Sequence, residues 1–234
     1  TDLFEGLWPI TREGVSYNTY LIKDEKNVIV DLTKSFSADE FLSQIDEVID
    51  VSNIDYVIIN HMEPDHSGIL RTLRRISPDI KILGTDKTAD MLEAFYGITE
   101  NVEVVEDGDE LSTGKMKLKF FKTPMVHWPE TMVTYEVKNK ILFSCDAFGS
   151  YGSLGGSIFD DDCTDMDFYI EEALRYYSNI VVKFNRMVIR AIEKLKDLEI
   201  DIVAPSHGRV WRDDPSTIIE LYRKWSEWAN GVED

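Results

Sequence analysis

The stretch that decides the fold is His61-Met62-Glu63-Pro64-Asp65-His66-Ser67-Gly68, which holds two of the chain's four histidines interleaved with two carboxylates. It follows the apolar run 56–60 and precedes a segment whose apolar residues recur at helical spacing. Alternate side chains in a loop at the end of a strand can converge on one point. The stretch therefore predicts a metal site at a strand end in a fold of mixed strands and helices.

Length and composition limit the classes of protein to which the chain can belong. With 234 residues it can bury a core, and we expect a single domain over residues 1–234. Asp and Glu number 44 against 25 Lys and Arg, and a net charge of -19 repels nucleic acid and anionic membranes. The sequence shows neither a signal-peptide pattern nor a run of about 18 apolar residues. We therefore expect a cytoplasmic protein without nucleic-acid or membrane partners.

Short apolar segments alternate with segments of helical spacing along the chain. Strands are predicted over 16–22, 27–31, 56–60, 81–83, 116–122, 131–137, 141–143 and 200–204. Helices are predicted over 38–49 with Ser37 as the cap, from about 67, and over 89–96, 166–178, 181–197 and 215–229. Turns are predicted at 23–26 and 138–140. This mixture predicts an α/β fold with a sheet-on-sheet core flanked by helices.

Three further ligand-type residues lie just past apolar β segments, as the opening stretch does: His127, Asp146 and His207. A single histidine after a strand is most often a turn or core residue, but four in such positions make a shared metal site the better account. The candidate ligands are His61, Glu63, Asp65, His66, His127, Asp146 and His207. Imidazoles and carboxylates suit zinc, manganese or iron. Seven ligands exceed the need of one tetrahedral ion, so two metals bridged by one carboxylate are predicted.

Glu63 bears on which metal is bound. A dinuclear zinc hydrolase of comparable layout would carry a histidine there, in the pattern H-x-H-x-D-H. The extra carboxylate gives the ligand set three negative charges, which favours a metal that rises in oxidation state, iron or manganese, over zinc. The alternative is a dinuclear zinc hydrolase of thioesters or lactones, which Glu63 disfavours. An RNA-processing nuclease is disfavoured by the acidic charge of the chain.

At these residues the chain resembles the metallo-β-lactamase-like diiron domain of the flavodiiron proteins, also called A-type flavoproteins. Besides the opening stretch, the similar segments are Ser16-Tyr-Asn-Thr-Tyr20, Pro124-Met-Val-His-Trp-Pro-Glu-Thr-Met132, Phe143-Ser-Cys-Asp-Ala-Phe-Gly149 and Ala204-Pro-Ser-His-Gly-Arg-Val-Trp211. They occur in family order and cover the chain from about residue 8 to about residue 226. The resemblance implies an αββα sandwich, with two mixed sheets flanked by helices.

The resemblance also implies how the seven residues divide between two iron ions. One iron would be bound by His61, Glu63 and His127, the other by Asp65, His66 and His207, with Asp146 bridging. In the family such a site reduces dioxygen to water or nitric oxide to nitrous oxide. The implied cofactors are therefore two iron ions, Fe2+ or Fe3+, and the implied ligand is dioxygen or nitric oxide.

The chain departs from the family pattern near its end. Family members continue into a flavodoxin-like domain that holds FMN, and this sequence has no room for one after its last predicted helix. We therefore expect no FMN in this chain. Electrons would come from a separate donor protein, or the site would act as an oxygen or redox sensor that reports to a signalling protein. In the family, two chains pair so that the FMN of one reaches the irons of the other. Without a flavin domain this reason for pairing is lost, and whether this chain forms a homodimer is left open.

Overall fold

The computed structural model describes residues 3–4, 8–9 and 14–231. The chain divides into two compact units, and each is discontinuous in sequence. Unit 1 comprises Thr1–Asn18, Thr123–Trp128 and Asn139–Asp234, and unit 2 comprises Thr19–Lys122 and Pro129–Lys138. Because the chain crosses between the units four times, neither unit is a separate stretch of sequence. A single domain over residues 1–234 stays a prediction.

Unit 2 contains the sheet that leads into the opening stretch. In order across the sheet its strands are β3 (Tyr20–Ile22), β4 (Val28–Val30), β5 (Tyr56–Ile58), β6 (Lys81–Gly84) and β7 (Val102–Val104). β3 and β4 pair antiparallel across the predicted turn at 23–26, and β4 to β7 pair parallel. Every residue of β4 and β5 is buried, as parallel strands covered on both faces require.

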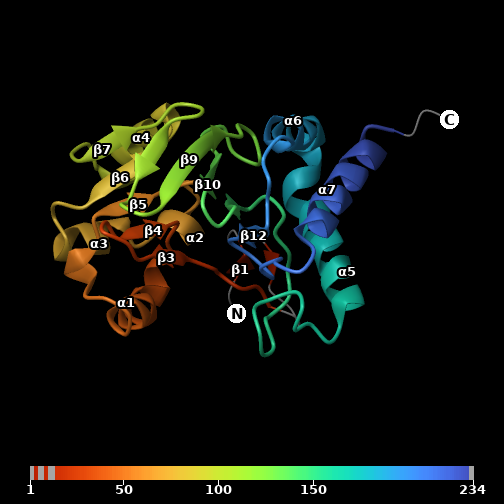
Figure 1. Ribbon diagram of the computed structural model, residues 1–234, viewed down its shortest axis with the longest axis horizontal. Helices are drawn as coiled ribbons and strands as arrows, with labels where there is room; N and C mark the ends of the chain where they lie inside the picture. The colour runs from red at the N-terminus through yellow and green to blue at the C-terminus, as the bar shows by residue number, and fades with distance from the viewer. Residues whose placement is uncertain (1–2, 5–7, 10–13, 232–234) are drawn as a thin grey trace. The chain divides into compact units, whose positions relative to one another are not determined.

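The helices of unit 2 connect these strands (Figure 1). They are α1 (Ala38–Asp46), α2 (Pro64–Ser67), α3 (Leu70–Ile76) and α4 (Asp86–Met91), with single turns η1 (Ser35–Ser37), η2 (Val51–Asn53) and η3 (Leu92–Tyr96). Their apolar faces pack with the sheet into one core, in which Ile29, Val57, Leu73 and Ile82 are fully buried. This core fixes the end of β5, where the ligand-type residues begin.

Three more strands of unit 2 form an antiparallel meander: β8 (Glu110–Ser112), β9 (Lys117–Lys122) and β10 (Met132–Glu136). Apolar and basic residues alternate along β9, so that Leu118 and Phe120 are buried and Lys117 is exposed. All of β10 is buried. The meander places Glu130, just before β10, beside the end of β5, where its carboxylate contacts the opening stretch.

Unit 1 contains β11 (Ile141–Cys145) and β12 (Ile202–Pro205), which pair parallel with a register shift between Phe143 and Cys145. Its helices are α5 (Met166–Tyr176), α6 (Asn185–Leu195) and α7 (Pro215–Ala229), with turns η4 (Tyr177–Val181) and η5 (Val182–Phe184) between α5 and α6. α6 packs against α7 (Figure 1). A short antiparallel pair, β1 (Leu3–Phe4) and β2 (Trp8–Pro9), also belongs to unit 1.

The predicted fold class is confirmed: apart from the β1–β2 pair, the described strands form two mixed five-stranded sheets flanked by helices, in the orders β3-β4-β5-β6-β7 and β12-β11-β10-β9-β8. The predicted strands are present with different ends. The segment 16–22 is a strand only from Tyr20, whereas the strands predicted at 81–83 and 141–143 continue to Gly84 and Cys145. Ser37 stands at the start of α1 but makes no side-chain capping bond. The helix expected from about 67 is two helices, and the first of them begins at Pro64. The opening stretch is thus partly helical and not wholly a loop.

Among the residues that the structure describes, no helix is both long enough and apolar enough to cross a membrane.

Candidate metal centre

The end of β5 is held in place by buried hydrogen bonds that do not involve the candidate ligands. The Asp31 carboxylate accepts from the Asn60 backbone N–H at 2.8 Å and from the Asn60 side-chain amide at 3.0 Å. Thr134 donates its hydroxyl to the Asn60 Oδ1 at 2.8 Å. Burial raises the pKa of the Asp31 carboxyl, against the opposing effect of His66 and the Asn60 amides. These bonds fix the residue immediately before His61, so the chain enters the opening stretch at a defined angle.

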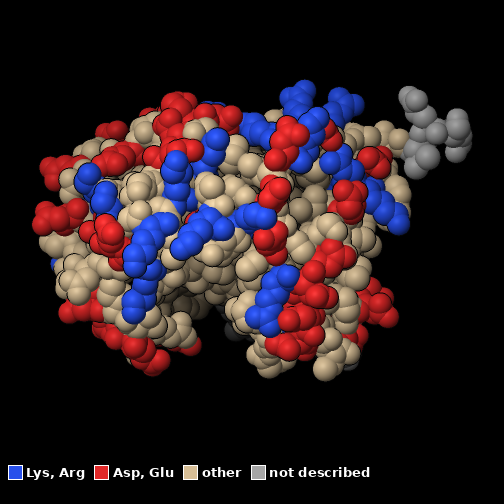
Figure 2. Space-filling view, viewed as in Figure 1, with Lys and Arg blue, Asp and Glu red and all other residues tan. Residues whose placement is uncertain are grey.

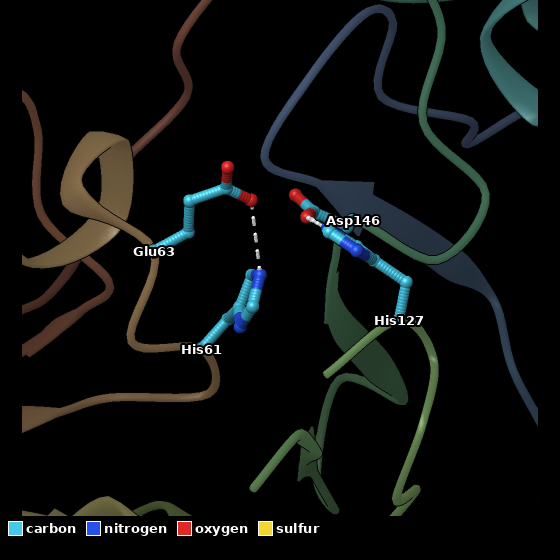
Figure 3. A group of neighbouring side chains, drawn as sticks. All are labelled: His61, Glu63, His127 and Asp146. Atoms are coloured by element: carbon cyan, nitrogen blue, oxygen red, sulfur yellow. Dashed lines mark hydrogen bonds and ion pairs between the residues drawn. The ribbon is translucent and has the colours of Figure 1, made fainter. Parts of the chain in front are cut away.

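Unit 2 brings four of the predicted site residues together. The His61 Nε2 lies 3.3 Å from the Glu63 Oε2, and the His66 Nε2 lies 3.4 Å from the Asp65 Oδ1. The two imidazole rings are 5.6 Å apart, centre to centre. All four side chains are buried. Figure 3 shows the Glu63 carboxylate turned toward the His61 ring.

Local sequence accounts for this arrangement. Pro64 stands at the first position of α2, where its fixed backbone angle suits a helix start and its missing N–H costs nothing. The turn that follows carries Asp65 and His66, and the Ser67 hydroxyl bonds back to the Met62 carbonyl at 2.8 Å. Gly68 closes the turn against the backbone of Pro64, where a Cβ would lie 2.5 Å from the Pro64 carbonyl oxygen.

Glu130 orients His61 from the side away from Glu63. Its Oε1 accepts from the His61 Nδ1 at 2.7 Å and from the Met62 backbone N–H at 2.9 Å. Burial acts to raise the pKa of the Glu130 carboxyl, but the His61 ring and the Met62 N–H outweigh it, and the pKa lies below its ordinary value. A carboxylate on Nδ1 leaves Nε2 as the free lone pair, which is how histidine ligands are commonly oriented toward a metal.

Unit 1 gathers the other three predicted residues around one carboxylate. The Asp146 Oδ2 lies 3.0 Å from the His127 Nε2, and its Oδ1 lies 3.3 Å from the His207 Nε2. All three side chains are buried, and Figure 3 shows the His127 ring against Asp146. Asp146 comes directly after β11, whose last residue, Cys145, has a left-handed backbone with φ of 51°. The reversal at Cys145 ends the strand and presents Asp146 to the two rings.

His207 is oriented by main-chain groups. Its Nδ1 donates to the Ser16 carbonyl oxygen at 2.8 Å, and its own carbonyl accepts from the Ser150 N–H at 3.2 Å. The next residue, Gly208, has φ of 83° and donates its N–H to the Ser16 hydroxyl at 2.8 Å. A Cβ on Gly208 would lie 1.9 Å from the Ser150 Oγ, so glycine is required for both its backbone angle and its space. The rings of Tyr17 and Tyr176 pack on His207 at 5.4 and 5.7 Å and keep its surroundings apolar.

The chemistry of these donors fits metal ions. Because a carbonyl oxygen only accepts, the proton of a neutral His207 sits on Nδ1, and Nε2 presents a lone pair to Asp146. The same reasoning applies to His61, whose Nδ1 faces Glu130 and whose Nε2 faces Glu63. Two acceptors about 3 Å apart need a proton or a cation between them. Each unit therefore supplies buried imidazoles and carboxylates of the kinds that bind metal ions.

All seven predicted residues lie in these two clusters, four in unit 2 and three in unit 1, and their assignment as metal ligands stays a prediction. Two groups that orient them were not predicted. Glu130 lies within the segment 124–132, but nothing in its spacing separates it from the other acidic residues of the chain. The contribution of Ser16 is a main-chain carbonyl, which has no signature in sequence.

Comparison with known proteins places the chain in a defined group. The sequence model described as ODP family beta lactamase matches residues 15–208. The chain is 41% identical over 227 residues to the anaerobic nitric oxide reductase flavorubredoxin of Salmonella arizonae, covering 95% of this chain and 47% of that protein. It thus spans about half the length of the curated relatives it matches.

Solved structures agree with the sequence relatives. Rubredoxin oxygen:oxidoreductase from Desulfovibrio gigas superposes with a TM-score of 0.91 at 31% identity, over 96% of this chain and 56% of that one. The flavodiiron protein from Giardia intestinalis superposes with a TM-score of 0.91 at 33% identity, over 97% and 55% of the two chains. The predicted metallo-β-lactamase-like fold is thereby confirmed.

Proposed function

Because the chain belongs to the ODP family of beta lactamase domains and is a homologue of the flavodiiron proteins, we propose that it is a nonhaem diiron protein that binds and activates dioxygen or nitric oxide. The observation that carries the proposal is the pairing of acceptors in both clusters, in which imidazole Nε2 atoms face carboxylate oxygens at 3.0 to 3.4 Å. Glu63 favours iron over zinc, because it adds a third carboxylate to the set.

In this proposal the clusters of the two units serve one dinuclear centre. One iron is held by His61, Glu63 and His127, the other by Asp65, His66 and His207, and Asp146 bridges them. When bound, two ferrous ions supply the electrons that reduce a diatomic ligand. The chain binds and orients these ions through buried side chains whose tautomers are set by Glu130 and by the Ser16 carbonyl.

The aromatic residues around the unit 1 cluster would shield the proposed metal site from water. Tyr17 and Tyr176 cover the His207 ring, and Phe148, two residues after Asp146, is buried. An apolar surrounding excludes water and lowers the local dielectric, which strengthens the hold of carboxylates on cations. It also admits apolar diatomic gases more readily than ionic substrates.

The relatives bear on whether the site reduces or senses its ligand. Their names describe a nitric oxide reductase and a rubredoxin oxygen:oxidoreductase. For this chain we propose reduction of dioxygen or nitric oxide with electrons from a separate protein, and sensing of the same ligands as the second form of the proposal. A cytoplasmic location belongs to the proposal as well.

The test is to purify the protein without oxygen, measure its metals by elemental analysis, then add dioxygen and record the visible spectrum. About two irons per chain and a new charge-transfer band are expected. The matched variant is Glu63→His, which restores the zinc-hydrolase pattern and should shift the metal content toward zinc. Zinc in the unaltered protein, with no spectral response and with hydrolysis of a thioester or lactone, would overturn the proposal in favour of the hydrolase.

Reduction and sensing are separated by a second measurement. The lifetime of the oxygenated protein is compared with the rate of oxygen consumption when a reductant and a small redox protein are supplied. Rapid consumption over many turnovers supports a reductase. A long-lived oxygenated form with consumption of about one equivalent supports a sensor.

A further inference from the structure

A concentration of positive charge lies on helix α6 and at its two ends in this acidic chain. Residues 183–196 include Lys183, Arg186, Arg190, Lys194 and Lys196 against a single acidic residue, Glu193, whereas the whole chain has a net charge of -19. Arg186 and Arg190 are exposed and stand one helical turn apart on α6, so they lie on one face. Figure 2 shows Lys and Arg side chains over α6 and α7, with some Asp and Glu side chains between them.

The two arginines of this face are not neutralised by carboxylates. The Arg186 Nε donates to the Asn230 Oδ1 at 3.4 Å, and the Arg190 Nη1 contacts the Met187 sulfur at 3.6 Å. Within the described part of the chain, neither guanidinium makes a salt bridge, whereas Arg212 pairs with Asp161 at 2.9 Å. Two exposed arginines whose charge no carboxylate balances attract an anionic partner, and each guanidinium can bind one carboxylate through two parallel hydrogen bonds.

An exposed tryptophan adjoins the arginines. Trp228 on α7 is 52% exposed, and the Lys224 Nζ lies 5.0 Å from the centre of its ring. The bond from Arg186 to Asn230 ties the start of α6 to the end of α7, two residues after Trp228. Tryptophan and arginine are the residues that most often carry binding energy at protein interfaces. We call this surface, made of Arg186, Arg190, Lys224 and Trp228, the α6–α7 face.

A packed aromatic route begins at Trp225 on α7, one helical turn before the exposed Trp228. Trp225, one turn before Trp228 on α7, is buried and lies 5.5 Å from the Tyr222 ring. Tyr222 lies 5.2 Å from the Phe148 ring and donates its hydroxyl to the Gly149 carbonyl at 2.7 Å. Phe148 and Gly149 follow the proposed bridging ligand, Asp146, by two and three residues. Ring contacts and one hydrogen bond therefore join Trp225, one helical turn from Trp228, to the loop of Asp146 within unit 1.

We propose that the α6–α7 face docks an acidic electron-donor protein, which delivers electrons through Trp225, Tyr222 and Phe148. In each step one electron leaves the donor's cofactor, which is oxidised, and reaches the oxidised metal site, which is reduced, and no covalent bond forms or breaks. The electron acceptor rests on the proposed function, but the docking does not. Because the rest of the chain is strongly acidic, a compact donor with one carboxylate-rich surface fits this face better than nucleic acid or an anionic membrane.

The test measures binding of two probes, an acidic rubredoxin and an acidic flavodoxin in their oxidised forms, by isothermal titration at low and high salt. In Arg186→Glu/Arg190→Glu we expect affinity for the bound probe to fall about tenfold or more at low salt, with the difference shrinking as salt rises. Trp228→Ala should weaken binding several-fold at both salt concentrations, because its contribution is apolar. Lys115→Glu/Lys138→Glu is the matched control, since it makes the same change in net charge on exposed residues of unit 2.

The experiment has separate outcomes for the docking surface and for the proposed diiron function. If the control weakens binding as much as the α6–α7 variants do, or if neither probe binds the unaltered protein in a salt-dependent way, the docking surface is overturned. Stopped-flow oxidation of the reduced probe by the iron-loaded protein is then measured, with iron content recorded for every sample. Electron transfer that is unaffected by the arginine variants also overturns the inference, whereas normal binding to a protein that holds no iron leaves the docking in place and refutes the proposed function.

Discussion

In unit 2 four ligand-type side chains come from six consecutive residues, 61–66, whereas in unit 1 three come from positions 127, 146 and 207, each after a different segment. The first group is set by one strand end and one helical turn. The second depends on β11, β12 and the loop at 123–128 all being in place. In unit 1 the three side chains are distant in sequence but meet at one carboxylate, since Asp146 lies against both His127 and His207.

The groups that orient the histidines also differ between the two units. His61 is held by the side chain of Glu130, which can be removed by mutation, and His207 by the main chain of Ser16, which cannot. A group assembled from one contiguous stretch can be tuned by distant side chains. A group assembled from several segments keeps its geometry under mutation when backbone atoms hold it, because a substitution does not remove the backbone carbonyl.

Removing the central carboxylate of unit 1 should have the largest effect. Asp146→Asn takes away the charge that faces both His127 and His207, so metal content after anaerobic reconstitution should fall from about two irons per chain to less than one. Glu63→Gln is the matched change in unit 2, and because it removes the carboxylate beside a single histidine, His61, in that unit it should lose about one iron. Elemental analysis of both variants checks this, and equal losses would show that the two carboxylates are equivalent.

The orienting partners give the second prediction. Glu130→Gln removes the charge beside the His61 Nδ1 and should weaken metal affinity about tenfold or more, as measured by competition with a chelator. Ser16→Ala keeps the carbonyl that holds His207 and removes only the hydroxyl that accepts from Gly208. It should leave metal affinity within about twofold while lowering the free energy of unfolding by about 1 kcal/mol. A loss of affinity in Ser16→Ala would mean that the hydroxyl, and not the carbonyl, positions the ring.

Substituting the glycine beside each cluster tests how tightly the local backbone is packed, with Gly208 in unit 1 and Gly68 in unit 2. Gly208→Ala meets both a left-handed backbone angle and the Ser150 side chain, whereas Gly68→Ala meets the Pro64 carbonyl at an ordinary angle. Each should lower the free energy of unfolding by about 1 to 3 kcal/mol in urea denaturation. Gly208→Ala should also weaken metal binding, because the next residue toward the cluster is His207 itself. Unchanged unfolding in both variants would show that neighbouring groups move aside freely.

The smallest effect concerns surface carboxylates in the two units under acid. Arg212 holds the pKa of Asp161 below its ordinary value in unit 1. In unit 2 burial acts to raise the pKa of Asp24, but hydrogen bonds from Thr113 and from three backbone N–H groups outweigh it and the pKa is lowered. A carboxyl with a lowered folded-state pKa stabilises the fold above about pH 4 and loses that contribution as pH falls through the folded pKa.

Salt should separate these two carboxylates. The contribution of the Asp161–Arg212 pair should decrease in high salt, and that of Asp24 should persist, because backbone hydrogen bonds are not screened in the same way. Thermal midpoints of Asp161→Asn and Asp24→Asn, each measured at pH 7 and near pH 3.5 in low and high salt, test this. If salt changes the two variants alike, the difference between an ion pair and a hydrogen-bonded carboxylate is not the reason.

Much of the fold follows from local patterns. α7 was predicted at both of its ends, because Pro215 suits a first helical position and the apolar spacing continues to Ala229. α2 begins at Pro64, about three residues before the predicted start, because proline suits a first helical position there as well. α4 begins at Asp86, before the predicted 89, and the cap that the Thr85 hydroxyl gives to the Thr88 N–H was the available signal.

The residues that orient the clusters could not be predicted in this way. Glu130 and His61 are 69 positions apart, and Ser16 and His207 are 191 apart. No periodicity connects residues at such separations, and they meet only because the strands between them pair. The candidate ligands, by contrast, could be found because each follows a strand whose apolar sequence is visible.

The main-chain bond to His207 also bears on how protons move. The Ser16 carbonyl holds the Nδ1 proton, and a carbonyl oxygen neither supplies a proton nor takes one up near neutral pH. A ring fixed in this way offers its other nitrogen as a ligand and cannot turn to pass protons between water and the buried carboxylates. Any proton that the proposed reduction consumes must therefore reach the metal site through a different group. His207 serves as a ligand of fixed orientation and does not relay protons.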